Sequence, residues 1–380
     1  MKKHLEVLDG LRGIAAISVV IFHFQELSLG PANPDSLWLR HAYLAVDFFF
    51  CLSGYVIAYA YDHRYGRMTI RQFFAARLIR LHPLVVIGVL LGLASFMFDP
   101  FNPGANTSNG LQLQQVPIWR LMVTVIGGIT MIPTKGLPNV EGSYFPLNWP
   151  SWSLMWEYIA NIAYALLLWR MRRGWLVVFV TISAVGLGTV AVTANDLIEG
   201  FAWGQMLPAL ARIAFSFSLG MLLFRCGAAL RTKLGFGTLS LILLLLFVGP
   251  FGSPVYGSHA PFNWIYELTI VLVVIPFIVV LGAGARTSGL VRSVCNLSGR
   301  ISYPIYMIHY AFVQLFLNYF CIRKISPGTV PWVIGVMTTF IALLAYGILI
   351  VVDEPLRLWL SRHRTIVDEL DYIGVGTEKG

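Results

Sequence analysis

Residues 8–27 read LDGLRGIAAISVVIFHFQEL, and this stretch indicates both the kind of fold and the place of the unusual polar side chains. Its middle, GIAAISVVIF, carries no charge, and a helix of about 20 such residues is long enough to cross a bilayer. Asp9, Arg12 and His23 lie in the same stretch, where charged or ionisable side chains cost free energy. We therefore interpret 8–27 as a membrane span that carries functional side chains.

The whole chain has the composition of a polytopic membrane protein. Of its 380 residues, 57% are apolar and 12% are charged, whereas a soluble domain has roughly 45–50% apolar and about 25% charged residues. The same figures exclude a disordered chain, which would be polar and poor in aromatic residues. The net charge of +9 comes from short clusters of Lys and Arg between apolar runs, such as Arg170–Arg173. This pattern is typical of cytoplasmic loops and argues against nucleic-acid binding.

Apolar runs of membrane-spanning length recur along the sequence and predict an all-α polytopic fold. We expect about ten transmembrane helices, at 8–27, 42–62, 82–98, 151–170, 175–193, 208–226, 236–251, 263–283, 300–321 and 330–352. A further apolar piece, 117–133, is short, is flanked by prolines and contains two glycines, so we expect a re-entrant segment there.

The distribution of Lys and Arg predicts the orientation of the spans. Basic residues place the N-terminus, the loop after the second span and the end of span 151–170 in the cytoplasm. Segment 99–116 has no Lys or Arg, so we expect it outside, with an outward cavity near 117–150. Both termini are then cytoplasmic in a multi-pass protein of the inner (plasma) membrane, with Arg323 and Lys324 as exceptions that would lie outside.

The chain is expected to form one domain, because no hydrophilic segment is large enough for a second and no repeat relates two halves. Residues 1–365 form the integral membrane domain, and 366–380 form a polar, disordered cytoplasmic tail. The four cysteines show no Cys-x-x-Cys spacing, which argues against a disulfide framework or a zinc site. We expect no metal and no permanently bound cofactor.

The first two spans carry candidate catalytic side chains. Arg12 and His23 are eleven residues apart, so they share a helical face and lie about 16 Å apart along the axis. Asp47 begins the second span at a depth similar to that of His23, either to orient the imidazole or to cap the helix. Ser53 is a candidate nucleophile, although a Ser-Gly pair more often allows close helix packing.

Further candidates lie near predicted membrane boundaries. Arg77 and Arg80 are neighbours on one helical face, either in a basic helix that touches anionic lipid or in a phosphate site. Trp152 belongs to a tryptophan-rich helix start that is typical of a membrane interface. Glu157 lies inside the same span, where a carboxylate is a functional candidate.

One late span carries a polar stripe. Ser302, Tyr306 and His309 are spaced i, i+4 and i+7, which puts a hydroxyl, a phenol and an imidazole on one side of a helix. This stripe predicts the wall of a polar tunnel. Glu354 closes the last span, where we expect it to pair with a basic residue.

Taken in this order, the motifs resemble those of the acyltransferase 3 family, integral membrane enzymes that O-acylate sugars and other hydroxylated acceptors. The matching pieces are LDGLRG with its Arg-x10-His pair, DFFFCLSG from Asp47, RLIR from Arg77, WSL with Glu157, SY with Tyr306 and His309, and the final Glu354-Pro355. The resemblance implies an acyl-CoA donor on the cytoplasmic side and an acceptor hydroxyl often presented outside. It also implies that activity depends most on Arg12 and His23. This sequence lacks the C-terminal esterase-like domain of many relatives, so we expect no function that needs it.

The resulting hypothesis is transfer of an acyl group, acetyl above all, from acyl-CoA to a hydroxyl of a sugar or glycan. His23 is the general base, oriented by Asp47 or Glu157. Arg12 is expected to hold the CoA phosphates together with Arg77 and Arg80, and the other residues expected to bind the donor are Ser302, Tyr306, His309, Ser53 and Trp152. Tyr306 and His309 either line the route of the thioester arm or donate to the developing oxyanion. Direct transfer is preferred over an acyl-enzyme on Ser53 or Ser302.

The alternative is a secondary transporter or flippase for a lipid-linked or small polar substrate, because intramembrane ionisable residues also form proton relays. Transporters commonly have paired broken helices in two repeated halves, whereas this sequence has one re-entrant candidate without a matching partner. A non-catalytic scaffold leaves Arg12 and His23 unexplained. The sequence leaves open the acceptor, the acyl chain length, the oligomeric state and any separate soluble partner.

Overall fold

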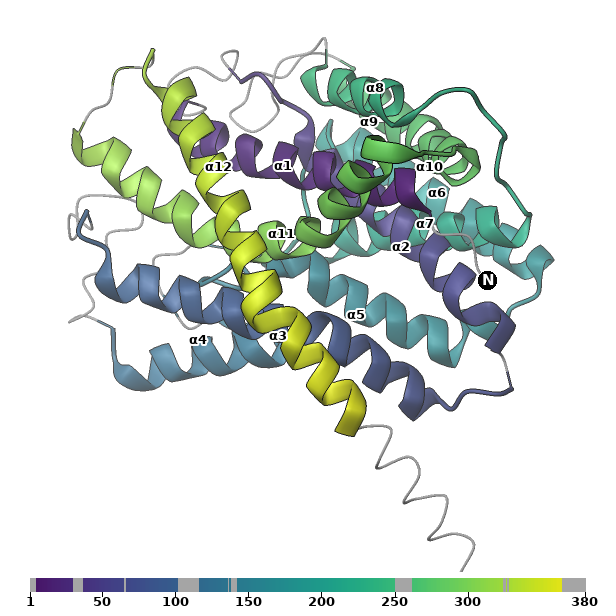
Figure 1. The fold of residues 1–380 in the computed structure, drawn as a ribbon, viewed down its shortest axis with the longest axis horizontal. Coiled ribbons are helices and arrows are strands. Elements are labelled where there is room, and N and C mark those ends of the chain that lie inside the picture. The colour runs from purple at the N-terminus through teal and green to yellow at the C-terminus, as the bar shows by residue number, and fades with distance from the viewer. Residues whose placement is uncertain are drawn as a thin grey trace, which may run out of the picture.

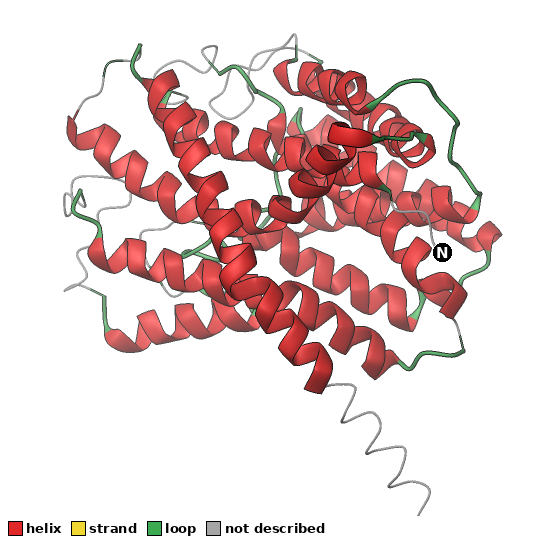
Figure 2. Cartoon of the chain, in the orientation of Figure 1, coloured by secondary structure: helices red, strands yellow, loops and turns green. Residues whose placement is uncertain are grey.

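The computed structural model describes residues 5–29, 37–64, 66–101, 116–135, 137, 142–249, 262–323, 326 and 328–363. Within these ranges the chain is mostly helical and forms no strand (Figure 2), and its β-type pairing is limited to one isolated bridge between Ser143 and Ala202. The prediction of an all-α polytopic membrane protein is confirmed. The predicted tail, 366–380, and most of segment 99–116 lie outside the described residues.

The helices follow the predicted apolar runs. They are α1 (Glu6–Ser28), α2 (Ala45–Tyr61), α3 (Ile70–Phe98), α4 (Ile118–Thr130), α5 (Ser151–Leu166), α6 (Arg173–Ala194), α7 (Met206–Arg225), α8 (Phe236–Val248), α9 (Asn263–Thr269), α10 (Ile275–Gly284), α11 (Gly289–Arg323) and α12 (Val330–Ile348). A π-helical turn, η7 (Ile270–Val274), joins α9 to α10, and a second, η8 (Leu349–Asp353), extends α12.

Eight helical runs in the described ranges are long and apolar enough to cross a membrane, with α9 to α10 counted as one run. Helices α5 and α8, at predicted spans 151–170 and 236–251, have 16 and 13 residues. Helix α8 ends at Gly249, whose φ of 56° cannot continue a right-handed helix. It is about 20 Å long, shorter than a hydrocarbon core of about 30 Å. The number of full crossings therefore stays a prediction.

Two helices are longer than the apolar runs that predict them. Helix α3 is capped by Thr69, whose side chain accepts a hydrogen bond from the Gln72 backbone N–H in a reciprocal cap. It continues through Pro83, so the basic segment and the predicted span 82–98 form one helix. Helix α11 likewise runs through Pro304 over 35 residues. Helix α3 therefore carries the candidate residues Arg77 and Arg80 in a turn that precedes its most apolar part.

The predicted re-entrant piece is one short helix, α4. It has 13 residues and ends where Met131 adopts the left-handed conformation. One face packs on α3, where Gly128 lies against Val89. The other face exposes apolar side chains such as Trp119 and Met122. A helix of this length is too short to cross a bilayer fully, as expected for the predicted re-entrant segment.

Helices α1 and α11 lie side by side and carry five of the eleven candidate residues (Figure 1). Glycines bring their backbones together, because a Cβ at Gly13 would lie 1.9 Å from the Ser298 Oγ. The Ser298 hydroxyl donates to the Gly10 carbonyl at 2.9 Å. Helix α2 contacts α7 in the same way at Gly54, so that its Ser-Gly pair does allow close packing.

Candidate functional site

A cavity of about 620 Å³ lies between α1, α2, α3, α5, α11 and the end of α12. Its volume falls in the range of pockets that enclose a small-molecule ligand. We name it the arginine cavity after its five basic lining residues, Arg12, Arg77, Arg80, Arg300 and Arg357. None of the described residues of segment 117–150 lines it, so it is not the outward cavity predicted near that segment.

Most of the predicted donor-binding residues line the arginine cavity. They are Arg77 and Arg80 from α3, Ser53 from α2, and Ser302 and Tyr306 from α11, together with Arg12 and Glu157. Of the polar stripe predicted on α11, Ser302 and Tyr306 line the cavity, whereas His309 does not. His23, His309, Asp47 and Trp152 are not among the lining residues.

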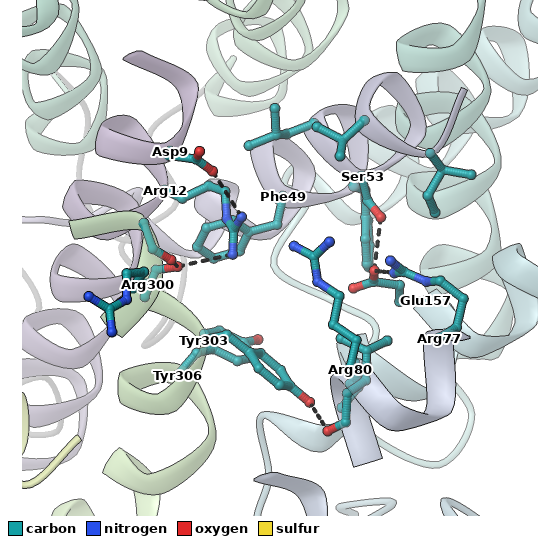
Figure 3. A pocket seen from close by; sticks show the side chains of 18 of the residues that line it. Asp9, Arg12, Phe49, Ser53, Arg77, Arg80, Glu157, Arg300, Tyr303 and Tyr306 are labelled. Carbon is teal, nitrogen blue, oxygen red and sulfur yellow. Dashed lines mark hydrogen bonds and ion pairs between the residues drawn. The ribbon is translucent and has the colours of Figure 1, made fainter. Parts of the chain in front are cut away.

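Arg12 bridges α1 and α11 across the cavity wall. Its Nη1 donates to the Asp9 carboxylate at 3.3 Å, and its Nη2 donates to the Ser302 hydroxyl at 3.2 Å (Figure 3). A guanidinium has five donors, so these two bonds leave others for a ligand.

Glu157 joins three helices on the opposite side of the cavity. Its Oε1 accepts from the Ser53 hydroxyl and from Nη2 of Arg77, both at 2.8 Å. The two residues are largely enclosed, with the Arg77 side chain only 6% exposed. Glu157 was one of the two carboxylates expected to orient His23, but the hydrogen bonds of its carboxylate lie with Ser53 and Arg77 instead.

Arg80 differs from its neighbours because its guanidinium makes no hydrogen bond or ion pair with any residue that the structure describes. The side chain is exposed to the cavity, and Figure 3 shows it extended into the open space between Arg12 and the Ser53–Glu157 pair. An unpaired guanidinium in such a place attracts an anion with oxygen acceptors, and phosphate fits its forked geometry.

The two predicted histidines lie together, one helical turn beyond the end of the cavity. The rings of His23 and His309 are stacked, with centroids 5.5 Å apart and an interplanar angle of 21°. His309 is fully buried, and its Nδ1 donates to the Tyr306 carbonyl at 2.8 Å. The Tyr306 ring lines the cavity and lies 5.9 Å from the His309 ring. His23 remains partly accessible, with 22% of its side chain exposed.

The carboxylate beside His23 is Glu26, which the sequence reasoning missed. Its Oε2 lies 3.0 Å from Nδ1 of His23. The two residues are three apart on α1, and this spacing was the available signal. Glu26 lies at the end of the predicted span 8–27, where a charged residue is common, so its position in the sequence does not single it out.

Asp47, the other carboxylate expected to orient His23, is paired with Arg212 of α7. The Arg212 Nη2 donates to Oδ2 at 2.6 Å, and its Nε lies 3.2 Å from each carboxylate oxygen. Both side chains are buried, and the Arg212 guanidinium lies 5.4 Å from the centre of the Trp152 ring. Asp47 and Trp152 therefore belong to a buried cluster around Arg212, whose guanidinium forms the ion pair with Asp47 and lies over the ring of Trp152. Arg212 is itself an intramembrane charge of span 208–226, the signal that identified Arg12.

A second buried carboxylate, that of Glu267 on α9, acts electrostatically on Asp47. The Glu267 carboxylate accepts from Asn263 at 2.6 Å and from the Leu197 backbone at 2.6 Å, and His41 lies 3.2 Å away. Burial raises the pKa of Asp196, in the segment between α6 and α7, to about 6. In the part of the chain that the structure describes, no group of His, Cys, Asp or Glu could hold a metal ion.

The family profile of an acyltransferase domain matches residues 5–351. The chain belongs to the acyltransferase 3 family. This acyltransferase is 31% identical to protein 2 of the picA locus of Rhizobium radiobacter over 188 residues, which are 49% of this chain and 93% of the relative. It is 23% identical over 384 residues to a protein of Staphylococcus aureus strain COL that is provisionally named an O-acetyltransferase.

That match covers 93% of this acyltransferase and 58% of the staphylococcal relative, so the chain spans somewhat more than half of the relative's length. The O-acetyltransferase OatA of Staphylococcus aureus strain NCTC 8325 is 32% identical over 102 residues, 26% of this acyltransferase and 15% of OatA. No solved structure matches the chain significantly.

Proposed function

We propose that this acyltransferase moves an acetyl group from acetyl-CoA to a hydroxyl of a sugar or glycan, with His23 as the general base. The observation that carries the proposal is the layout of one cavity. Unsatisfied guanidinium donors line its wall, and Tyr306 at its end lies one helical turn before a stacked histidine pair. The names of the staphylococcal relatives support acetyl as the acyl group and oxygen as the acceptor atom.

The donor is bound through its phosphates. Arg80 has no protein partner among the described residues, and Arg12 keeps donors beyond its bonds to Asp9 and Ser302. A nucleotide thioester supplies the phosphate oxygens that these groups lack, because guanidinium and phosphate form paired hydrogen bonds. Arg77 is engaged by Glu157 and adds positive charge to the wall.

The chemistry follows from the arrangement around His23. With Nδ1 hydrogen-bonded to Glu26, the other ring nitrogen accepts the proton of the acceptor hydroxyl. The hydroxyl oxygen attacks the thioester carbonyl carbon, the carbon–sulfur bond breaks, and the imidazolium returns its proton to the departing thiolate. Glu26 stabilises the imidazolium while it exists, in place of the two carboxylates suggested by the sequence.

The structure favours Tyr306 over His309 as the donor to the oxyanion. His309 Nδ1 lies close to two backbone carbonyls, which only accept hydrogen bonds, so this nitrogen carries the proton. Its Nε2 is then an acceptor and cannot stabilise negative charge. The Tyr306 hydroxyl lies 2.7 Å from the Ser153 hydroxyl and can redirect its proton toward a substrate.

The test is transfer of radiolabel from acetyl-CoA to a glycan extract by the purified full chain. We expect His23→Ala to lower transfer by at least about 100-fold, the usual scale for loss of a general base, while expression and CoA binding are retained. His363→Ala is the matched control, because His363 is exposed at the end of the α12 run and is not among the residues that line the arginine cavity. Substantial transfer by well-folded His23→Ala protein would exclude His23 as the base, and uptake of substrate without modification would indicate a transporter.

A further inference from the structure

One charged pair of the arginine cavity is placed differently from the rest. Arg300 of α11 and Glu354, directly after η8, form a forked ion pair, with Nη2 at 2.7 and 2.9 Å from the two carboxylate oxygens and Nε at 3.1 Å from one. Their side chains are 48% and 37% exposed, whereas Arg77 is 6% exposed. In Figure 3 Arg300 lies at the edge of the cavity, on the far side of Arg12 from Arg80. The Arg300–Glu354 pair therefore lies at the rim of the arginine cavity, and we call it the rim pair.

This rim pair is easily exchanged for another anion. Water reaches both side chains of this pair and screens their charges, which weakens the attraction between them. A phosphomonoester carries up to two negative charges and three acceptor oxygens, so it offers a guanidinium fork more than one carboxylate does. Glu354 also follows the π-helical turn η8, and such turns frequently occur at functional sites.

The order of residues along α11 gives the cavity a direction. From Arg300 to Tyr306 the helix rises about 9 Å, and His309 follows one turn later. A donor with its thioester near the histidine pair therefore has the opposite end of the molecule near Arg300. In CoA the end farthest from the thioester is the nucleoside, whose ribose carries a 3′-phosphate in addition to the inner diphosphate.

We propose that Arg300 is a specificity-determining residue that exchanges Glu354 for the 3′-phosphate of the CoA donor, while Arg12 and Arg80 bind the diphosphate. This inference rests on the proposed function and extends it to the choice between CoA and its analogue without the 3′-phosphate. Glu354 keeps the rim neutral while the cavity holds no donor and competes with the phosphate when the donor enters.

The experiment compares acetyl-CoA with acetyl-dephospho-CoA as donors for the purified full chain. We expect the wild type to prefer acetyl-CoA by about 10-fold or more in kcat/KM, the scale of one charge-assisted contact. Arg300→Gln should raise KM for acetyl-CoA, so that kcat/KM for acetyl-CoA falls to the value for acetyl-dephospho-CoA. The same variant should leave kcat/KM for acetyl-dephospho-CoA unchanged. Glu354→Gln should keep the preference and lower KM for acetyl-CoA, because the competing carboxylate is gone.

Arg292→Gln is the matched control. Arg292 lies two turns earlier on α11, is 55% exposed and pairs with Glu6, but it is not among the residues that line the arginine cavity. Its loss should leave the preference intact. Equal use of both donors by the wild type, or an equal loss for both donors in Arg300→Gln, would overturn the inference and leave the proposed function standing. Transfer from neither donor by the wild type would contradict the proposed function, and the inference with it.

Discussion

At the residue scale, His23 has two neighbours that affect a proton on its ring in different ways. Glu26 lies at hydrogen-bond distance from Nδ1, and a carboxylate there both fixes the tautomer and stabilises the charged ring. His309 stacks on the face of the ring and brings no negative charge. The support for a proton held by His23 therefore comes from Glu26, on the same helix.

Glu26→Gln should lower kcat for acetyl transfer by about 10- to 100-fold, because glutamine keeps the shape of the side chain but cannot balance the charge of an imidazolium. KM for acetyl-CoA should not change, since Glu26 is not a lining residue of the arginine cavity. Steady-state kinetics with varied donor measure both quantities. A change in KM alone would mean that Glu26 acts in donor binding and not through His23.

At the element scale, the contact between α1 and α11 holds the two parts of the site together. Arg12 and His23 come from one helix, whereas Ser302, Tyr306 and His309 come from the other. Gly13 has no room for even a methyl group, because the Ser298 hydroxyl and carbonyl would lie 1.9 and 2.7 Å from its Cβ. The spacing of the two helices is therefore set by a backbone contact, which leaves little freedom for repacking.

Gly13→Ala should separate α1 from α11 and lower both transfer activity and Tm in detergent. Gly186→Ala is the control, because Gly186 lies inside α6 with open space around it, and alanine is the better helix former by about 1 kcal/mol. We expect Gly186→Ala to keep wild-type activity with an equal or higher Tm. Wild-type activity in the Gly13→Ala protein would show that the site tolerates a displacement of α1.

The difference between contacts within one helix and contacts between helices explains what could be predicted from the sequence. Helices and the faces they present depend on residues near one another in the chain, so the shared face of Ser302 and Tyr306 could be predicted, although His309 of the same predicted stripe does not line the cavity. Partners on other helices have no such local signal, and the pairing of Asp47 with Arg212 could not be predicted. The lengths of α3 and α11 were underestimated because hydropathy ends where the polar turns begin, although the backbone continues.

At the scale of the whole molecule, a buried charge network ties together helices that are distant in the chain. Arg212 of α7 binds Asp47 of α2 and also donates to the Glu199 carbonyl at 2.9 Å and the Tyr43 carbonyl at 3.2 Å. Removal of one partner leaves a buried charge without compensation, which typically costs about 3–5 kcal/mol. We therefore assign Asp47 a role in holding the bundle together.

Asp47→Asn and Arg212→Met should each lower Tm in detergent strongly. The double variant should lower Tm by less than the sum of the two single decreases. Tryptophan fluorescence during heating is a suitable measurement. Glu354→Gln is the comparison, because it breaks an exposed ion pair and should change Tm little. Loss of activity in Asp47→Asn with an unchanged Tm would instead support a catalytic role for Asp47.

The backbone contact at Gly13 has a consequence for substrate choice. Arg12 and His23 sit on one rigid helix about 16 Å apart along its axis, and α11 runs beside it at a fixed separation. Under the proposed function the two helices act as a molecular ruler for the arm between the diphosphate and the thioester. Carriers with a shorter or longer arm would place the acyl carbon out of register with the base, whereas changes in the acyl group beyond that carbon leave the register unaffected.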